Sequence, residues 1–251
     1  MCPVTPMNPC GTLRALVITA AVATALAGCH TRPANDVLAT GTKRYSQFDE
    51  ELIIRHFFDD QRGGIFVDIG AWHWRDGSTT LYLEKHLEWT GIAVDAQDSV
   101  RQGYLDNRPG TKFFQYAVTN TSGQRIKFFL GGQLSSTSRQ YTEFYDEPQA
   151  DQRAPEMEVE TITMNDLLAR EGIARIDFLS MDIEDGEPAA LAGFDIEKYR
   201  PRLVCIEAHD AVQDAIAKYF ADHRYERIDE YLERDTLNWY FRPKARWWPW
   251  W

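Results

Sequence analysis

Apolar runs of strand length alternate with helical patterns along most of this chain. The predicted strands include Ile65–Ile69, Gly91–Asp95, Ile176–Met181 and Arg202–Ile206, and the predicted helices include Thr79–His86, Ser99–Asn107, Met164–Glu171, Pro188–Ala192 and Ala211–Asp222. Such alternation predicts an α/β fold with a mostly parallel, twisted sheet covered by helices on both faces. Two final strands, Tyr225–Tyr231 and Thr236–Phe241, follow each other without a helix. They predict an antiparallel hairpin at the C-terminal side.

The middle of the chain departs from this alternation. Lys112–Val118 and Arg125–Leu130 are predicted to be extended, with a turn between them. The stretch from Gly131 to Pro155 is polar and rich in serine, glutamine and glycine. We expect it to form a long loop or insertion.

The N-terminal segment has the pattern of a secretory signal. A single positive charge, Arg14, precedes an apolar stretch that ends in Leu26-Ala27-Gly28-Cys29. This ending resembles the lipobox of bacterial lipoproteins, so we expect Cys29 to be lipidated and to become the mature N-terminus. An uncleaved apolar N-terminal helix is the alternative. The predicted organisation is a lipoprotein-type signal peptide at 1–28, a tether at 29–44, one domain at 45–243 and a tryptophan-rich tail at 244–251.

The tail carries four tryptophans in Trp247–Trp251, after Lys244 and Arg246. Tryptophan rings favour the lipid headgroup layer, and basic neighbours favour anionic lipid. The tail is therefore predicted to be a second membrane contact, with a clamp over an apolar groove of the domain as the alternative. The chain is therefore predicted to be a membrane-anchored bacterial lipoprotein. If the signal is not processed, the predicted location is the cytoplasm or the cytoplasmic face of the membrane.

Charge and cysteine content exclude some classes of function. The formal net charge is 27 minus 38, or −11, so nucleic acid is not an expected partner. The four cysteines (Cys2, Cys10, Cys29 and Cys205) form no Cys-x-x-Cys pair, which argues against a zinc ribbon and a disulfide framework. Cys205 lies in an apolar strand pattern and is expected to be a buried packing thiol.

Acidic residues end several of the predicted strands. Asp68 ends the first strand and Asp95 the second, whereas Asp182 and Glu184 follow the third and Glu207 and His209 follow the fourth. In an open parallel sheet, ligands bind outside the carboxyl ends of the strands. The sequence therefore predicts a site at this edge.

The turn after the first strand selects the kind of cofactor. A dinucleotide needs Gly-x-Gly-x-x-Gly so that its diphosphate can approach the backbone. Here Gly70 is followed by Trp72, His73 and Trp74, which argues against a nicotinamide oxidoreductase. S-adenosylmethionine has no phosphate, and its cationic sulfonium suits an acidic rim. Asp95, 27 residues after Asp68, is placed to accept hydrogen bonds from the ribose hydroxyls.

Two separated blocks carry a resemblance to a known family. The first contains Phe66–Ala71, Ser78–Thr80 and Trp89–Asp95, and the second contains Ile176–Glu184 and Arg200–Glu207. From Gln47 to about Arg242 the chain resembles FkbM-type methyltransferases. The resemblance implies a class I, Rossmann-like methyltransferase fold and methyl transfer from S-adenosylmethionine, commonly to a hydroxyl oxygen. The residues expected to bind this cofactor are Asp68, Gly70, Ala71, Thr79, Asp95, Ala96 and Ala117.

Methyl transfer to a hydroxyl requires a positioned acceptor and removal of its proton. Asp182, Glu184 and His209 are the predicted catalytic residues, and His73 is a further candidate base. Asp182 and His209 could share one acceptor or one divalent ion, but no metal ligands are assigned. The expected acceptor is a glycan or a small metabolite. The alternative is an inactive envelope lipoprotein that uses the same fold as a binding module, which a calorimetric titration with S-adenosylmethionine would distinguish.

Overall fold

A central sheet organises the chain. The computed structural model describes Met1 and residues 37–139, 142–143 and 154–245. Among these residues the main sheet has seven strands, in the order β3 (Thr111–Gln115), β2 (Thr90–Asp95), β1 (Ile65–Ile69), β7 (Phe178–Met181), β8 (Leu203–Glu207), β10 (Asn238–Pro243) and β9 (Tyr225–Arg227). The first five are parallel, whereas β10 runs antiparallel to both β8 and β9. The predicted fold class, including the C-terminal hairpin, is confirmed.

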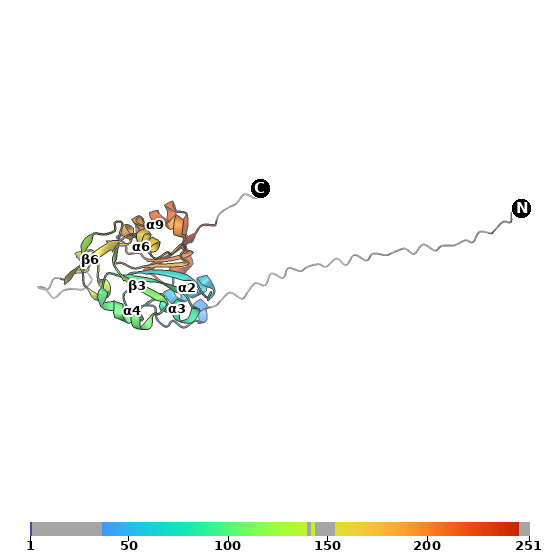
Figure 1. Ribbon diagram of the computed structural model, residues 1–251, viewed down its shortest axis with the longest axis horizontal. Coiled ribbons are helices and arrows are strands. Elements are labelled where there is room, and N and C mark those ends of the chain that lie inside the picture. The colour runs from blue at the N-terminus through green and yellow to red at the C-terminus, as the bar shows by residue number, and fades with distance from the viewer. Residues whose placement is uncertain (2–36, 140–141, 144–153, 246–251) are drawn as a thin grey trace. The chain divides into compact units, whose positions relative to one another are not determined.

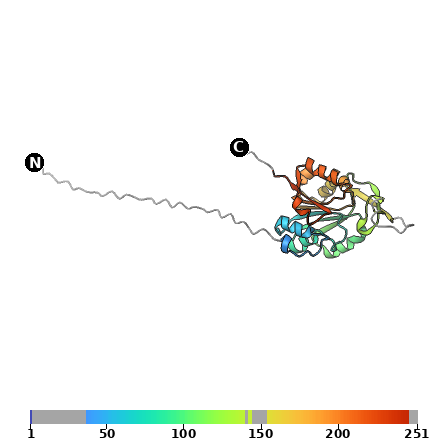
Figure 2. The same cartoon turned by 180° about the vertical axis from the view of Figure 1, so that it is seen from behind.

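Helices cover both faces of this sheet (Figures 1 and 2). One face packs against α2 (Glu50–Phe58) and α3 (Leu81–Leu87), and α4 (Arg101–Asn107) lies on the same side. The other face packs against α6 (Met164–Arg170), α7 (Glu187–Ala192) and α9 (Gln213–Asp222). Short helices complete the described chain: α1 (Val37–Thr40), α8 (Ile196–Tyr199), η1 (Asp98–Val100), η2 (Gly132–Leu134) and η3 (Asp229–Tyr231).

Alternate strand residues supply the two cores. In β1, Phe66 packs with the α2–α3 side, while Val67 packs with the α6–α9 side. The same alternation separates Phe178 from Leu179 in β7. Because successive side chains of a strand point to opposite faces, both faces of these strands are apolar and buried. This explains why the strands appear in the sequence as continuous apolar runs.

A second, smaller sheet stands beside the first. Its order is β4 (Ala117–Val118), β6 (Glu156–Ile162) and β5 (Arg125–Phe129), with β5 antiparallel to β6 and β4 parallel to it. The strand β6 is not predicted from the sequence. The strand places exposed glutamates between residues that face the domain, and its ladder partner β5 lies some thirty positions earlier in the chain (Arg125 pairs with Glu160). The residues next to β6 in the sequence therefore do not indicate that it pairs with β5.

The start of the domain differs in two details from the expectation. Part of the predicted tether packs against the domain, because α1 contacts α2 and Val37 is buried. Ser46, followed three residues later by Asp49, predicts a helix start at Ser46, but the first long helix begins at Glu50, after Asp49. The Ser46 hydroxyl instead accepts a hydrogen bond from the backbone N–H of Glu51 (3.2 Å).

The membrane-related predictions concern residues outside this description. Residues 2–36, which include the signal segment and Cys29, and residues 246–251, which include the tryptophans of the tail, are not among the described residues. Lipidation and membrane contact stay predictions. Within the described ranges, no helix is long and apolar enough to cross a bilayer. Cys205, by contrast, is described and buried, as expected.

Candidate active site

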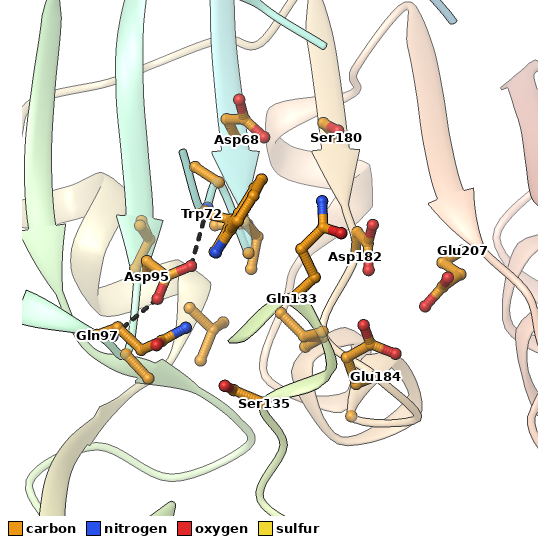
Figure 3. A pocket seen from close by; sticks show the side chains of 18 of the residues that line it. Asp68, Trp72, Asp95, Gln97, Gln133, Ser135, Ser180, Asp182, Glu184 and Glu207 are labelled. Atoms are coloured by element: carbon orange, nitrogen blue, oxygen red, sulfur yellow. Dashed lines mark hydrogen bonds between the residues drawn. The ribbon is translucent and has the colours of Figure 1, made fainter. Parts of the chain in front are cut away.

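A cavity of about 500 Å³ opens at the carboxyl edge of the central sheet. Its volume falls within the range of about 300–1,000 Å³ typical of small-molecule and cofactor sites. All residues predicted for cofactor binding and catalysis line it, namely Asp68, Gly70, Ala71, Thr79, Asp95, Ala96, Ala117, Asp182, Glu184 and His209. In Figure 3, Asp95 lies at one side of the cavity, and Asp182, Glu184 and Glu207 lie at the other. The fold thus brings the two predicted groups into one space.

Gly70 shapes the floor between the two sides. Its φ is +80°, a left-handed conformation that non-glycine residues rarely adopt. A Cβ atom at this position would lie 1.7 Å from the backbone carbonyl oxygen of Asp182. The ends of β1 and β7 are held together here because the N–H of Asp182 donates to the carbonyl of Ile69 (2.9 Å). A glycine is therefore required for the two strand ends to meet.

Asp95 is held rigidly at the end of β2. Its two carboxylate oxygens accept the backbone N–H groups of Trp72 (2.9 Å) and Gln97 (2.7 Å) (Figure 3). Burial raises the pKa of Asp95 to about 6, against the opposing effect of these hydrogen bonds. A carboxylate has about four lone-pair positions, so acceptor capacity remains for ligand hydroxyls. This arrangement fits the ribose of S-adenosylmethionine.

The segment after Gly70 supports Asp95 instead of blocking the cavity. Trp72 lines the cavity and provides one of the N–H groups that hold Asp95. His73 is not among the residues that line the cavity, and its Nδ1 accepts the backbone N–H of Asp76 (2.8 Å). The structure therefore does not support His73 as a base. The bulky segment forms a structured turn at the rim.

Asp68 belongs to a buried polar network beneath the turn. Its carboxylate accepts the Thr80 hydroxyl (2.7 Å), and the Arg108 guanidinium bonds the same hydroxyl oxygen (3.2 Å). Arg108 is fully buried and forms an ion pair with Glu84 (2.5 Å). Burial raises the pKa of Asp68, while Thr80 and Arg108 oppose that shift. Asp68 thus lines the cavity while also anchoring α3 against the end of β1.

The second sheet provides an apolar wall next to Asp95. Ala96, Ala117 and Phe128 pack in one cluster with Val159, and Ile126 packs against it. Ala96, Ala117, Ile126 and Phe128 all line the cavity. A flat, uncharged ring system can pack on such a surface. The two alanines are among the residues predicted from the sequence, whereas Ile126 and Phe128 are not, because the second sheet was not expected to form a wall of the site.

The opposite side of the cavity is acidic. Asp182 is exposed to solvent, and it is one of the residues that line the cavity. The protein around the cavity still reduces the hydration of its carboxyl group. Desolvation, followed by repulsion from Glu207, Glu184 and Glu187, raises the pKa of Asp182 well above its ordinary value. A carboxyl group in this setting binds a proton more tightly than a free aspartate does. Among the described residues that line the cavity there is no lysine or arginine.

His209 stands between two carboxylates. Its Nε2 lies 3.3 Å from Oε1 of Glu207, and its Nδ1 lies 3.3 Å from Oδ1 of Asp185. The hydrogen bond to Glu207 raises the pKa of His209 to about 9, although partial burial opposes this shift. In this form the ring is a donor and a positive charge near neutral pH.

A loop that the sequence analysis left unassigned closes the cavity from a third side. Gln133, Ser135 and Thr137 line it. The loop is attached to the strand ends, because the Ser136 hydroxyl donates to the carbonyl of Glu184 (2.9 Å) and Gln97 donates to the carbonyl of Gly132 (3.2 Å). No local pattern in this polar stretch marks these residues as part of a site.

Glu50, also missed, is a buried carboxyl group on the cavity wall. Desolvation raises its pKa from the ordinary value of 4.5 to about 7, and repulsion from Asp235 adds to the shift. Between these two pH values the folded chain keeps a proton that the unfolded chain releases, so stability should fall as pH rises through that window. The expected loss is on the order of 3 kcal/mol.

Replacing Glu50 with glutamine should remove this component. Urea unfolding from pH 4.5 to 8 would measure it as a stability difference between variant and wild type that grows with pH. The comparison cancels the contributions of other titrating groups. Parallel stability curves for the two proteins would show that Glu50 titrates normally in the folded chain.

Comparisons with known proteins agree with this geometry. Residues 68–235 match the family described as Methyltransferase FkbM domain. The chain is 27% identical to 31-O-demethyl-FK506 methyltransferase FkbM of Streptomyces tacrolimicus over 219 residues, which cover 76% of this chain and 82% of that protein.

Two solved structures are also similar. One is methyltransferase FkbM from Methylobacillus flagellatus KT (16% identity, TM-score 0.46, covering 84% of this chain and 48% of that one). The other is a TehB-like SAM-dependent methyltransferase from Corynebacterium glutamicum (12% identity, TM-score 0.43, covering 83% and 93%). The chain thus spans about half the length of the Methylobacillus flagellatus protein.

Proposed function

Because the chain belongs to the FkbM methyltransferase family, we propose that it methylates a hydroxyl oxygen of a glycan or small metabolite. Its cofactor is S-adenosylmethionine. The observation that supports the proposal is one cavity in which Asp95 lies at one side and the acidic groups Asp182, Glu184 and Glu207 lie at the other (Figure 3). A methyl donor held at the first side would present its reactive carbon toward the second.

The cofactor side is built from three kinds of contact. Asp95 would accept hydrogen bonds from the ribose hydroxyls, and the wall of Ala96, Ala117 and Phe128 would pack against the adenine ring. Gly70 and Ala71 allow the remainder of the cofactor to pass close to the backbone. When bound, S-adenosylmethionine would supply a methyl group, and the cationic sulfur that carried this group would leave as part of a neutral thioether.

The acceptor side must position a hydroxyl and take its proton. Asp182 is the proposed proton acceptor, because its carboxyl group faces the cavity at the end of β7, next to the Gly70 turn. Glu184 and His209 line the same side, so they are proposed to orient the acceptor through hydrogen bonds. This concentration of titratable groups beside the cofactor site does not favour a module that only binds.

The proposal is tested with full-length protein, S-adenosylmethionine labelled in its methyl group, and a panel of polyhydroxylated acceptors. Label should be transferred to an acceptor and should remain after mild base treatment, because methyl ethers resist base whereas methyl esters hydrolyse. Calorimetry on the same protein should detect cofactor binding. Bound cofactor with label found only in base-labile esters or on nitrogen would contradict the assignment to hydroxyl oxygen.

Replacing Asp95 with alanine should weaken cofactor binding. A hydrogen bond to a charged group contributes about 1.5–3 kcal/mol, so the loss of even one ribose contact predicts a roughly 10- to 150-fold rise in Kd. Calorimetric titration measures the change. Asp98→Ala is the matched control, since Asp98 is a nearby exposed carboxylate paired with Arg101. Unchanged affinity in a folded Asp95→Ala protein would remove Asp95 from the cofactor site.

A further inference from the structure

The acidic side of the cavity has the composition of a metal site. We propose that Glu184, Glu207 and His209 bind a divalent metal ion beside Asp182. One potential ligand atom from each of the three residues lies within 4.8 Å of the others. Glu184 follows β7, while Glu207 and His209 end and follow β8, so two adjacent strand ends bring the ligands together.

The spacing of these atoms suits a shared ion after small side-chain movements. Ligand atoms 2.0–2.2 Å from one ion lie about 3 Å apart when adjacent and at most about 4.4 Å apart when opposite. The Nε2 of His209 is already 3.3 Å from Oε1 of Glu207, and a metal ion bound between them would take the place of the proton on that nitrogen. Glu184 is fixed through its backbone, because its carbonyl accepts the Ser136 hydroxyl. Its side chain lies on the same side of the cavity as Asp182 and Glu207 (Figure 3).

A second, independent observation comes from Glu207. Its side chain is 10% exposed and lines the cavity, yet its Oε2 is buried without a hydrogen-bond partner. Leaving a buried acceptor unpaired is costly, and such a group in a native structure points to an unobserved ion or water. The other cavity residues around this oxygen include Asp182 and Glu184, which are also acidic. A cation satisfies Glu207 and reduces the repulsion among all three carboxylates.

The ligand set indicates which ions fit. Carboxylates favour Mg²⁺ and Mn²⁺, whereas an imidazole favours Mn²⁺, Fe²⁺ or Zn²⁺ over Mg²⁺. Three protein ligands leave coordination positions open for water or for an acceptor oxygen. If the proposed methyl transfer is correct, an acceptor hydroxyl bound there becomes more acidic and lies next to Asp182. That role rests on the proposed function, but the metal site itself does not.

The test uses full-length protein freed of metal with a chelator and then titrated with Mn²⁺ alone. Electron paramagnetic resonance should show one tightly bound Mn²⁺ per chain. Electron spin echo modulation should show a coupled nitrogen that disappears in His209→Gln. Glu207→Gln should weaken Mn²⁺ binding at least about tenfold. Glu50→Gln is the matched control: it removes a buried cavity carboxyl that also has an unpaired oxygen, but one outside the ligand set.

Each result has a definite meaning. Equal weakening by Glu207→Gln and Glu50→Gln, or bound Mn²⁺ without nitrogen coupling, would overturn the site in favour of diffuse attraction to an acidic cavity. If Glu207→Gln fails to fold, the metal site is tested by the nitrogen coupling of bound Mn²⁺ and by the loss of that coupling in His209→Gln. Calorimetry with S-adenosylmethionine on the metal-free protein separates the two proposals, since cofactor binding without Mn²⁺ binding rejects only the metal site.

Discussion

Asp182→Asn should lower turnover by about 10²–10⁴-fold and leave cofactor affinity unchanged. Asparagine has nearly the same shape as aspartate but cannot accept the proton of the acceptor hydroxyl. Asp182 lies on the opposite side of the cavity from Asp95, so calorimetry with S-adenosylmethionine should give the wild-type Kd (Figure 3). Rates of labelled methyl transfer measure turnover.

The control for this variant is Asp76→Asn. Asp76 also lines the cavity, but its side chain is 74% exposed at the rim. The substitution makes the same change of side chain at the rim of the cavity and should cost less than about tenfold in turnover. If Asp182→Asn loses cofactor binding and turnover together, then Asp182 belongs to the cofactor pocket or to the fold.

Gly70→Ala should produce the largest loss of stability, more than about 4 kcal/mol, which is exceptional for one substitution. The new Cβ would overlap the carbonyl oxygen of Asp182, a backbone atom that cannot move without separating β1 from β7. Total stabilities of about 5–15 kcal/mol mean that this variant should be only marginally folded. Urea unfolding, together with the soluble fraction on expression, measures the effect.

Gly63→Ala separates the two causes of strain in that variant. Gly63 has a similar φ of +72°, but a Cβ there would meet no atom within 4 Å. Its alanine variant should lose only the roughly 1–2 kcal/mol of a left-handed non-glycine residue. Equal losses in both variants would mean that the close approach of Asp182 is relieved by local movement.

Much of the candidate site follows from short-range sequence patterns. The strand β1 has the predicted bounds, Ile65–Ile69, and β2 differs by one residue at its start. These strands are buried on both faces, so their apolar runs are continuous and the sequence shows clearly where each strand begins and ends. The acidic residues at the strand ends then lie at one edge because parallel strands place their carboxyl ends together. This is why Asp95, Asp182, Glu184 and His209 could be grouped from the sequence.

The remainder depends on contacts between distant segments. The β6 strand escaped prediction because the residues that make it a strand are in β5 and β4, and Ile126 and Phe128 were missed with it. Glu50 comes from a helix that precedes the sheet, and its position on the cavity wall depends on how that helix packs. The Ser136–Glu184 hydrogen bond places the closing loop. A polar loop has no periodic pattern, so its position is set by such individual bonds.

The sequence by itself determined the alternation of strands and helices in the central sheet and the residues that end its parallel strands. These depend on hydrophobic periodicity and on the handed geometry of parallel strand connections, both of which act over short stretches of chain. Only the tertiary structure decided the electrostatic environment of these groups, since the raised pKa of His209 and the unpaired oxygen of Glu207 arise from spacing and burial. Electrostatic energy depends on distance and on exclusion of water, and a linear sequence specifies neither.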